Sequence, residues 1–352
     1  MPLHNVGYRE WNGRKTPQWS RWWIIASTGM RLAIKSRWVR RLLFFAWLPV
    51  MYWGGAFFAL EQINSQAIQA QQVESLEDVI PNLKQEARRR AGPTSMSQLM
   101  RQQFPFIPNV NKVADALESG DQAEIRNTVW KWLLMTFFRY PQATLILFLL
   151  GFITPGLISR DVRSRAFLLY FSRPIGRLEY IVGKLVVPAA YMIAVTTMPA
   201  LVLYLFAIGL SPDLSVMLNT WDIPFRILAA SVVLVIPTAS LALMFSSLTH
   251  ESRFASFAWF AIWALGHGAW FAIVLSQAIR MQTAPFDPEV LDSAMVQSWS
   301  VLSLYNNLGD IQSWIFGFST FQESWPGIAA LGVLTVVSLV ILYRRVSAPI
   351  RV

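Results

Sequence analysis

The chain has 352 residues, of which 54% are hydrophobic and only 14% are charged. Soluble globular domains carry roughly 25% charged residues, so this composition excludes an ordinary soluble protein and indicates a polytopic membrane protein. The complete absence of cysteine excludes disulfides, thiolate metal sites and thiol catalysis in one step.

The N-terminal segment ends in a predicted amphipathic entry helix, residues 20–41. Ser27, Arg31 and Lys35 share one face at helical spacing, and the opposite face is apolar and aromatic. Basic residues opposite tryptophans suit a helix that lies in the membrane interface. The alternative is an ordinary basic flank of the first span. The residues expected to anchor this interfacial helix are Trp22, Trp23, Arg31 and Lys35.

Six apolar runs follow, and each is long enough to cross a bilayer core of about 30 Å, which needs roughly 20 residues. Prolines at positions 188, 199 and 237 lie inside the third and fourth runs, where a membrane bundle tolerates them. The first run comes too late for a cleavable signal peptide, so we expect a retained anchor. The second run is expected to carry Arg139 at its outer end. The six expected spans are 42–60, 132–158, 185–209, 225–248, 254–277 and 326–343.

The net charge of +10 is distributed unevenly, and this distribution predicts the orientation. Segment 1–41 holds nine Lys/Arg and one acid, segment 159–184 holds six and two, and segment 344–352 holds three and none. Segments 61–131 and 278–325 are balanced or acidic. The positive-inside rule therefore predicts that both termini and 159–184 are cytoplasmic, and that the other two segments are external. The basic excess then requires no nucleic-acid partner.

The two external segments differ in character. Segment 61–131 is rich in good helix formers and is broken by prolines, so we expect a small helical insert on the outer mouth. Its Arg88-Arg89-Arg90 run is expected to be a solvated patch, with a substrate or lipid-headgroup role as the alternative. Segment 278–325 is aromatic and apolar in part, and it predicts short helices that dip toward the bilayer before the last span.

The motifs of several enzyme classes are missing from the sequence. The three histidines have no metal-ligand spacing, and neither a zinc-protease HExxH nor a P-loop GxxxxGK[ST] occurs. His267 is interpreted as a helix-packing residue. The charged residues between positions 185 and 277 lie near the span ends, which disfavours an ion-coupled transporter. We therefore expect no catalytic residues, no metal and no cofactor bound by this chain, which is not expected to be an enzyme.

The most informative segment is the basic hairpin 158–184, ISRDVRSRAFLLYFSRPIGRLEYIVGK. It resembles the element that joins the second and third spans of ABC-2 type transporter permeases, which combines a basic stretch, a short apolar helix, Ser-Arg-Pro and a closing Gly-Lys. Arg165 stands where the family usually has Gly, and Leu168 where an acid is frequent. The matching residues are Asp161, Arg163, Ser164, Ser172, Arg173, Pro174, Glu179, Tyr180, Gly183 and Lys184.

The resemblance extends over most of the chain and implies a fold and a function. The implied fold is all-α and polytopic, with six transmembrane helices, the interfacial helix, a cytoplasmic coupling helix over 166–171 and the external insert. The implied function is the permease subunit of an ATP-driven exporter in a cell membrane, expected to be a bacterial inner membrane. The residues expected to couple the chain to its ATPase are Arg160, Asp161, Arg163, Ser164, Arg165, Phe167, Arg173, Pro174, Glu179 and Lys184.

The implied partners are two copies of an ABC ATPase subunit, which bind the ATP and Mg²⁺, and a second permease subunit in a homodimer or heterodimer. Two alternatives stay open at this point. The hairpin is a basic loop anchored on lipid with no partner, or the chain is a non-transporting scaffold or sensor whose 61–131 insert binds an external ligand. The sequence does not identify a transported substrate.

Overall fold

The computed structural model describes residues 20–77, 110–119, 121–166, 175–211, 215–285, 287–291 and 293–347. Within these ranges the secondary structure is helical, without strands. Six helices are long and apolar enough to cross a membrane, which confirms the predicted all-α polytopic fold. They cover Arg37–Gln62, Ala123–Arg163, Arg177–Leu210, Ile223–Leu248, Ser252–Met281 and Phe321–Val346.

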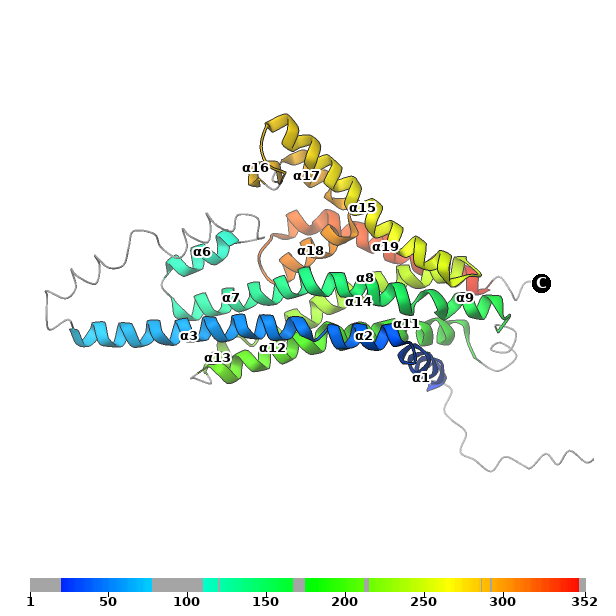
Figure 1. Cartoon of the computed structure of the whole chain (residues 1–352), viewed down its shortest axis with the longest axis horizontal. Coiled ribbons are helices and arrows are strands. Elements are labelled where there is room, and N and C mark those ends of the chain that lie inside the picture. The colour runs from blue at the N-terminus through cyan, green and yellow to red at the C-terminus, as the bar shows by residue number, and fades with distance from the viewer. Residues whose placement is uncertain are drawn as a thin grey trace, which may run out of the picture.

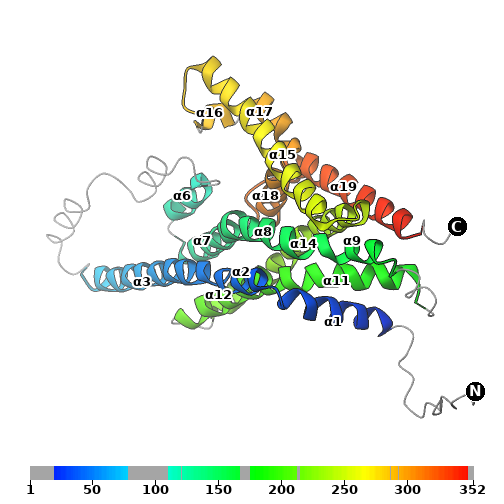
Figure 2. The same cartoon turned by 45° about the vertical axis from the view of Figure 1, so that its right-hand side comes forward.

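The chain enters the bundle through α1 (Arg21–Ile34), α2 (Arg37–Phe45) and α3 (Leu48–Glu77). Figure 1 shows α1 nearly end-on, and Figure 2 shows it from the side, so α1 runs crosswise to the long helices. Helix α3 continues well past residue 60, the expected end of the first span. This continuation has neither Gly nor Pro and consists largely of good helix formers, so the helix has no local reason to stop at the membrane.

The second span belongs to one long helical run. After α6 (Val110–Ser119) the chain forms α7 (Gln122–Phe137), a π-helical turn η2 (Phe138–Gln142), α8 (Ala143–Ile153) and α9 (Pro155–Arg163). The Asp121 side chain caps α7 by accepting a 2.9 Å hydrogen bond from the backbone N–H of Ala123. The π turn contains Pro141, whose missing N–H cannot join an α-helical ladder.

Arg139 lies in the π turn, inside the helical run from Ala123 to Arg163, which begins well before the expected start of the second span at residue 132. The polar stretch before Arg139 is also helical and packs on α3. There, Glu61 accepts hydrogen bonds from Arg126 at 3.0 Å and from the Trp130 ring at 3.1 Å.

The centre of the bundle is α14 (Ile223–Leu248), which contacts α8, α9, α11, α12, α15, α18 and α19. The third span precedes it as α11 (Arg177–Val195) and α12 (Thr197–Leu210), followed by the short α13 (Ser215–Asn219). The most apolar window of α14 is 72% buried, and many of its inward residues are Ala, Ser or Thr. Small side chains allow close helix approach, and this explains why so many neighbours fit around one helix.

The last part of the fold begins with α15 (Ser252–Met281), which leans away from the bundle toward its C-terminal end (Figure 1). Short pieces follow as α16 (Pro288–Leu291), α17 (Ala294–Trp299), η3 (Ser300–Leu302) and α18 (Leu304–Ile315). Helix α18 packs on α14, α15 and α19 (Phe321–Ser347). Short helices are therefore present where the sequence predicted them, and the last of them is packed among the long ones.

The basic segments gather at one end of the bundle. The end of α9, the start of α11, the turn between α14 and α15 and the end of α19 lie together in Figure 1. The end of α3, the start of α7, α6 and α13 lie at the opposite end. The two ends are therefore assembled from the segments that the charge distribution assigns to opposite sides of the membrane.

Candidate functional site

The candidate site lies where α9 and α11, the two arms of the basic hairpin, reach the end of the bundle. Residues 167–174 lie outside the described part of the chain, so the expected coupling helix cannot be placed. The same applies to three of the expected coupling residues, Phe167, Arg173 and Pro174. The other members of that set lie on the arms, and the structure separates them into two groups.

The first group joins the two arms. The ammonium of Lys184 lies 2.7 Å from the Asp161 carboxylate and donates a 2.7 Å hydrogen bond to the carbonyl oxygen of Leu157. The Tyr180 hydroxyl donates to the same carboxylate at 2.8 Å. The Lys184 and Asp161 side chains are 9% and 16% exposed, so water screens their attraction poorly. These residues bind each other and fix α9 against α11.

Glu179 also acts within the chain. Its carboxylate accepts a 2.9 Å hydrogen bond from the backbone N–H of Gly176, one turn before it, at the start of α11. This is the second half of a capping box, and a negative charge in the first turn also complements the helix dipole. The start of α11 is therefore held at a defined residue, although the eight residues before Ile175 are not described.

The second group points outward from the end of α9. Arg160, Arg163, Ser164 and Arg165 are all exposed, and the Ser164 hydroxyl donates a 2.8 Å hydrogen bond to the Arg160 carbonyl. Three cations thus occupy the last turn of α9 and its cap, where positive charge is favoured by the helix dipole. This cluster, Arg160, Arg163 and Arg165, is called the arginine cluster below.

The C-terminal cap of α9 has an ordinary hydrogen-bond geometry, but an arginine occupies the position where glycine is usual. Arg165 has a φ of 54°, in the left-handed region that favours glycine. The Ala166 N–H donates to the Asp161 carbonyl at 2.9 Å and the Arg165 N–H donates to the Val162 carbonyl at 3.3 Å, which together form a Schellman motif. The departure noted in the sequence, Arg in place of Gly, therefore falls on the position where Gly has its physical advantage.

Ser246 connects α9 to the core of the bundle, and it was not among the residues predicted from the sequence. Ser246, on α14, accepts hydrogen bonds from the backbone N–H groups of Ile158 and Ser159 at 3.1 and 3.2 Å and donates to the Pro155 carbonyl at 2.8 Å. The break before Pro155 leaves first-turn groups of α9 without helical partners, and Ser246 satisfies them. Because Ser246 is distant in sequence and sits in an apolar run, no local signal identifies it.

The expected interfacial residues lie on α1, which is firmly packed. Ile25, Ala26 and Gly29 are buried, and the Tyr191 hydroxyl on α11 donates a 2.7 Å hydrogen bond to the Met30 carbonyl. A Cβ at Gly183 of α11 would lie 2.8 Å from the carbonyl oxygen of Trp22, so only glycine permits this approach. Of the four expected anchors, Trp22 is partly buried. The other three are exposed: Trp23, Arg31 and Lys35.

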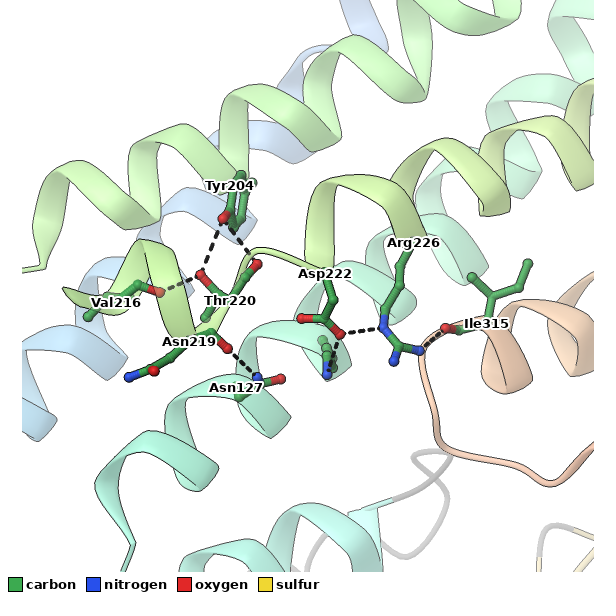
Figure 3. Close-up of polar contacts among 9 residues, drawn as sticks. Asn127, Tyr204, Val216, Asn219, Thr220, Asp222, Arg226 and Ile315 are labelled. Carbon is green, nitrogen blue, oxygen red and sulfur yellow. Dashed lines mark hydrogen bonds and ion pairs between the residues drawn. The ribbon is translucent and has the colours of Figure 1, made fainter. Parts of the chain in front are cut away.

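A second polar cluster holds the opposite end of the bundle (Figure 3). The Asp222 carboxylate lies 2.7 Å from Arg226 Nε and 2.8 Å from Lys131 Nζ, and Arg226 also donates to the carbonyl oxygen of Ile315. Burial alone would raise the pKa of Asp222, but hydrogen bonds and positive charge from Lys131 and Arg226 outweigh it and lower the pKa below 3.8. The cluster joins α7, α14 and the end of α18.

The contacts at the hairpin end thus join α9 to α11 through Asp161 and Lys184, and join α9 to α14 through Ser246. In the described ranges, no three His, Cys, Asp or Glu side chains are grouped so that they could hold a metal ion.

Comparison with known proteins identifies the class to which this architecture belongs. No curated protein and no solved structure matches the chain. The family model described as ABC-2 family transporter protein matches residues 23–347, from the start of α1 to the end of α19. Permeases of this family work with an ABC ATPase. With its six apolar helices and this match over nearly its whole length, the chain belongs to the ABC-2 family, as a multi-pass membrane permease of an ABC transporter.

Proposed function

We propose that this permease couples ATP hydrolysis on a separate ATPase subunit to the export of a substrate, and that the hairpin end carries the coupling. The observation that carries the proposal is that the hairpin residues on α9 and α11 fall into two groups, one that joins the two helices and one that is exposed. Asp161 and Lys184 close the arms onto each other, while the arginine cluster is exposed beside them. A rigid base with a cationic tip suits contact with an acidic groove on a partner.

The coupling step needs no chemistry on this chain. ATP and Mg²⁺ bind the partner, and closure of the partner displaces the hairpin. The buried ion pair and the Ser246 contacts then move α9, α11 and α14 as one body, because interdigitated helices do not deform continuously. This orientation requires the hairpin and both termini to be cytoplasmic, with the α6 end of the bundle external.

A second permease subunit completes the proposed assembly, with two ATPase subunits beneath the pair. The most apolar windows of the first and fifth spans are each only 17% buried, against 67% for the second. The first and fifth spans each carry two glycines, Gly54 and Gly55 in the first and Gly266 and Gly268 in the fifth, and small residues allow close helix approach. Gly54 and Gly266 are covered by the chain itself, whereas a Cβ at Gly55 or Gly268 would meet nothing within 4 Å. Gly55 and Gly268 therefore remain available for a partner.

Charge reversal in the arginine cluster tests the coupling role. Arg163→Glu is expected to abolish copurification of the ATPase and to lower ATP hydrolysis by the complex at least tenfold, because each charge-assisted contact contributes about 1.5–3 kcal/mol. Arg280→Glu, an equally exposed arginine at the far end of α15, is the matched control and is expected to keep both. Unchanged copurification and hydrolysis in Arg163→Glu would remove the hairpin from the mechanism.

A further inference from the structure

A cavity of about 640 Å³ lies beneath α1, on the side of the site that faces the long helices. One face of α1, from Arg21 to Ala33, forms its first wall and continues to Ser36 before α2. The end of α8 and most of α9, from Phe152 to Asp161, form the second wall. Lys184 of α11 closes one side. Its volume falls in the range of about 300–1,000 Å³ that small-molecule sites occupy.

The cavity is apolar along its walls and cationic at one end. Ile24, Leu32 and Phe152 line it and remain 53%, 57% and 47% exposed, so the walls open onto the apolar surroundings of the protein. The charged lining comprises three bases and one acid, Arg21, Arg160, Lys184 and Asp161. Because Asp161 is already paired with Lys184 at 2.7 Å, the remaining charge of the lining is positive.

The side chain of Arg160 lies in the cavity wall. An added Cβ at Gly156 would lie 3.0 Å from Arg160 Nε and 3.2 Å from its Cζ, so the guanidinium is folded back over the helix by one turn. No acid of the described ranges lies within ion-pair distance of it. Arg160 is itself exposed, so its guanidinium stays accessible to an anion that enters the cavity, and a charge-assisted hydrogen bond to that anion is favourable.

The apolar and the cationic parts of the cavity lie at different depths along the span, as the two parts of an amphiphile do in a membrane. The Arg160 guanidinium is folded back over Gly156, and Phe152 lies four residues before Gly156 along the helical run, which is roughly 6 Å at 1.5 Å per residue. The apolar wall therefore lies deeper along the span than the guanidinium. α1 supplies part of the lining and runs crosswise to the long helices, since Figure 1 shows it nearly end-on. A helix that lies in a membrane surface has this orientation.

We propose that this cavity binds one anionic phospholipid, whose phosphate lies against Arg160 and whose acyl chain follows Ile24, Leu32 and Phe152. A small free anion satisfies the guanidinium but leaves the apolar walls open, and a zwitterionic lipid brings its own cation to the positive end. The bound lipid bridges α1 and α9, so it stiffens the joint on which the hairpin turns. This inference requires only the membrane location, and its test uses the chain without an ATPase.

The test uses the purified full-length chain in detergent, titrated with dioleoyl phosphatidylglycerol and observed by native mass spectrometry. One tightly held lipid per chain is expected, with dioleoyl phosphatidylcholine at least tenfold weaker. Arg160→Gln is expected to weaken phosphatidylglycerol binding about tenfold, the effect of one lost charge-assisted contact. Thr28→Trp, an exposed lining position, is expected to fill the cavity and reduce binding of both lipids.

Two matched variants and one competitor distinguish the alternatives. Arg163→Gln, one turn further along α9, and Ser27→Trp, beside Thr28, do not line the cavity and are expected to bind as the wild type does. Equal affinity for both lipids, or equal losses in Arg160→Gln and Arg163→Gln, would overturn the proposal. Displacement of phosphatidylglycerol by excess glycerol 3-phosphate would show a site for the phosphate alone, and would also overturn it. If Thr28→Trp fails to fold, Arg160→Gln alone decides.

Discussion

Among the single residues, Arg165 adopts a backbone conformation that lowers the stability of the α9 cap, and it adds a positive charge there. The left-handed conformation costs a residue with a Cβ roughly 1–2 kcal/mol, and glycine avoids most of this cost. The Schellman hydrogen bonds around Arg165 are complete, so nothing else in the cap requires an arginine. The side chain is exposed beside Arg160 and Arg163, where a third cation extends the arginine cluster. Strain retained at such a position points to a role for the side chain.

Arg165→Gly is therefore expected to stabilise the protein by about 1 kcal/mol, because glycine relieves the strain at φ 54°. Thermal unfolding of the purified chain in detergent measures the change. Ser164→Gly is the matched control. Its φ of −84° is ordinary, so glycine there is expected to leave the midpoint unchanged or lower it. A midpoint for Arg165→Gly at or below that of the wild type would contradict this account of the cap.

At the scale of helices, the ion cluster around Asp222 determines how the end of α14 is joined to α7 and α18. Asp222→Asn removes the only carboxylate shared by Lys131 and Arg226 in this cluster, and it is expected to cost about 2 kcal/mol of unfolding free energy at pH 7. The wild-type advantage exists because the folded state lowers the pKa of Asp222. It is fully present above the ordinary pKa of 3.8 and is lost as the pH falls through the lower folded-state value.

The measurement is thermal unfolding of both proteins from neutral to strongly acid pH, with Glu289→Gln as a control for loss of an exposed acid. The two curves are expected to converge at the acid end. A difference that stays constant with pH would show that the carboxylate charge contributes nothing to the joint.

The helices also show how far the sequence could be interpreted alone. The six spans could be predicted from the apolar runs, because each bilayer crossing demands about 20 such residues. The residue at which α3 ends and the residue at which α7 begins could not be predicted, since a helix of good helix formers continues beyond the apolar region. The contacts of Arg139 could not be predicted either, because its ring contact with Tyr305, at 4.8 Å, and its approach to Gly309 join distant segments and leave no local pattern.

The sequence predicted which residues belong to the candidate site, but it did not predict which of them contact one another. The motif identified Asp161, Lys184 and Glu179 together with the exposed arginines, because all of them belong to one basic hairpin. A motif does not say which members face one another. The pairing of Asp161 with Lys184, and the contacts made by Ser246, depend on the crossing of α9, α11 and α14.

At the scale of the whole molecule, the two ends of the bundle are different in kind. One end carries the exposed arginine cluster on a base that is fixed to α14, and the other carries α6, α13 and α16 (Figure 1). The most apolar windows of the first, fifth and sixth spans are only 17%, 17% and 22% buried, which leaves apolar surface exposed on the sides of the bundle. We therefore expect the ATPase at the first end and the proposed partner permease on the sides.

Site-specific crosslinking tests this assignment most directly, because the native chain has no cysteine and any introduced one is unique. Arg163→Cys places a single thiol at the end of α9, and Glu289→Cys places one in α16. Figure 1 shows the end of α9 and α16 far apart along the molecule. In membranes that contain the complex, a short bifunctional reagent is expected to join the Arg163→Cys variant to the ATPase and to leave the Glu289→Cys variant unjoined. An ATPase crosslinked through position 289, or through neither position in an active complex, would contradict the account.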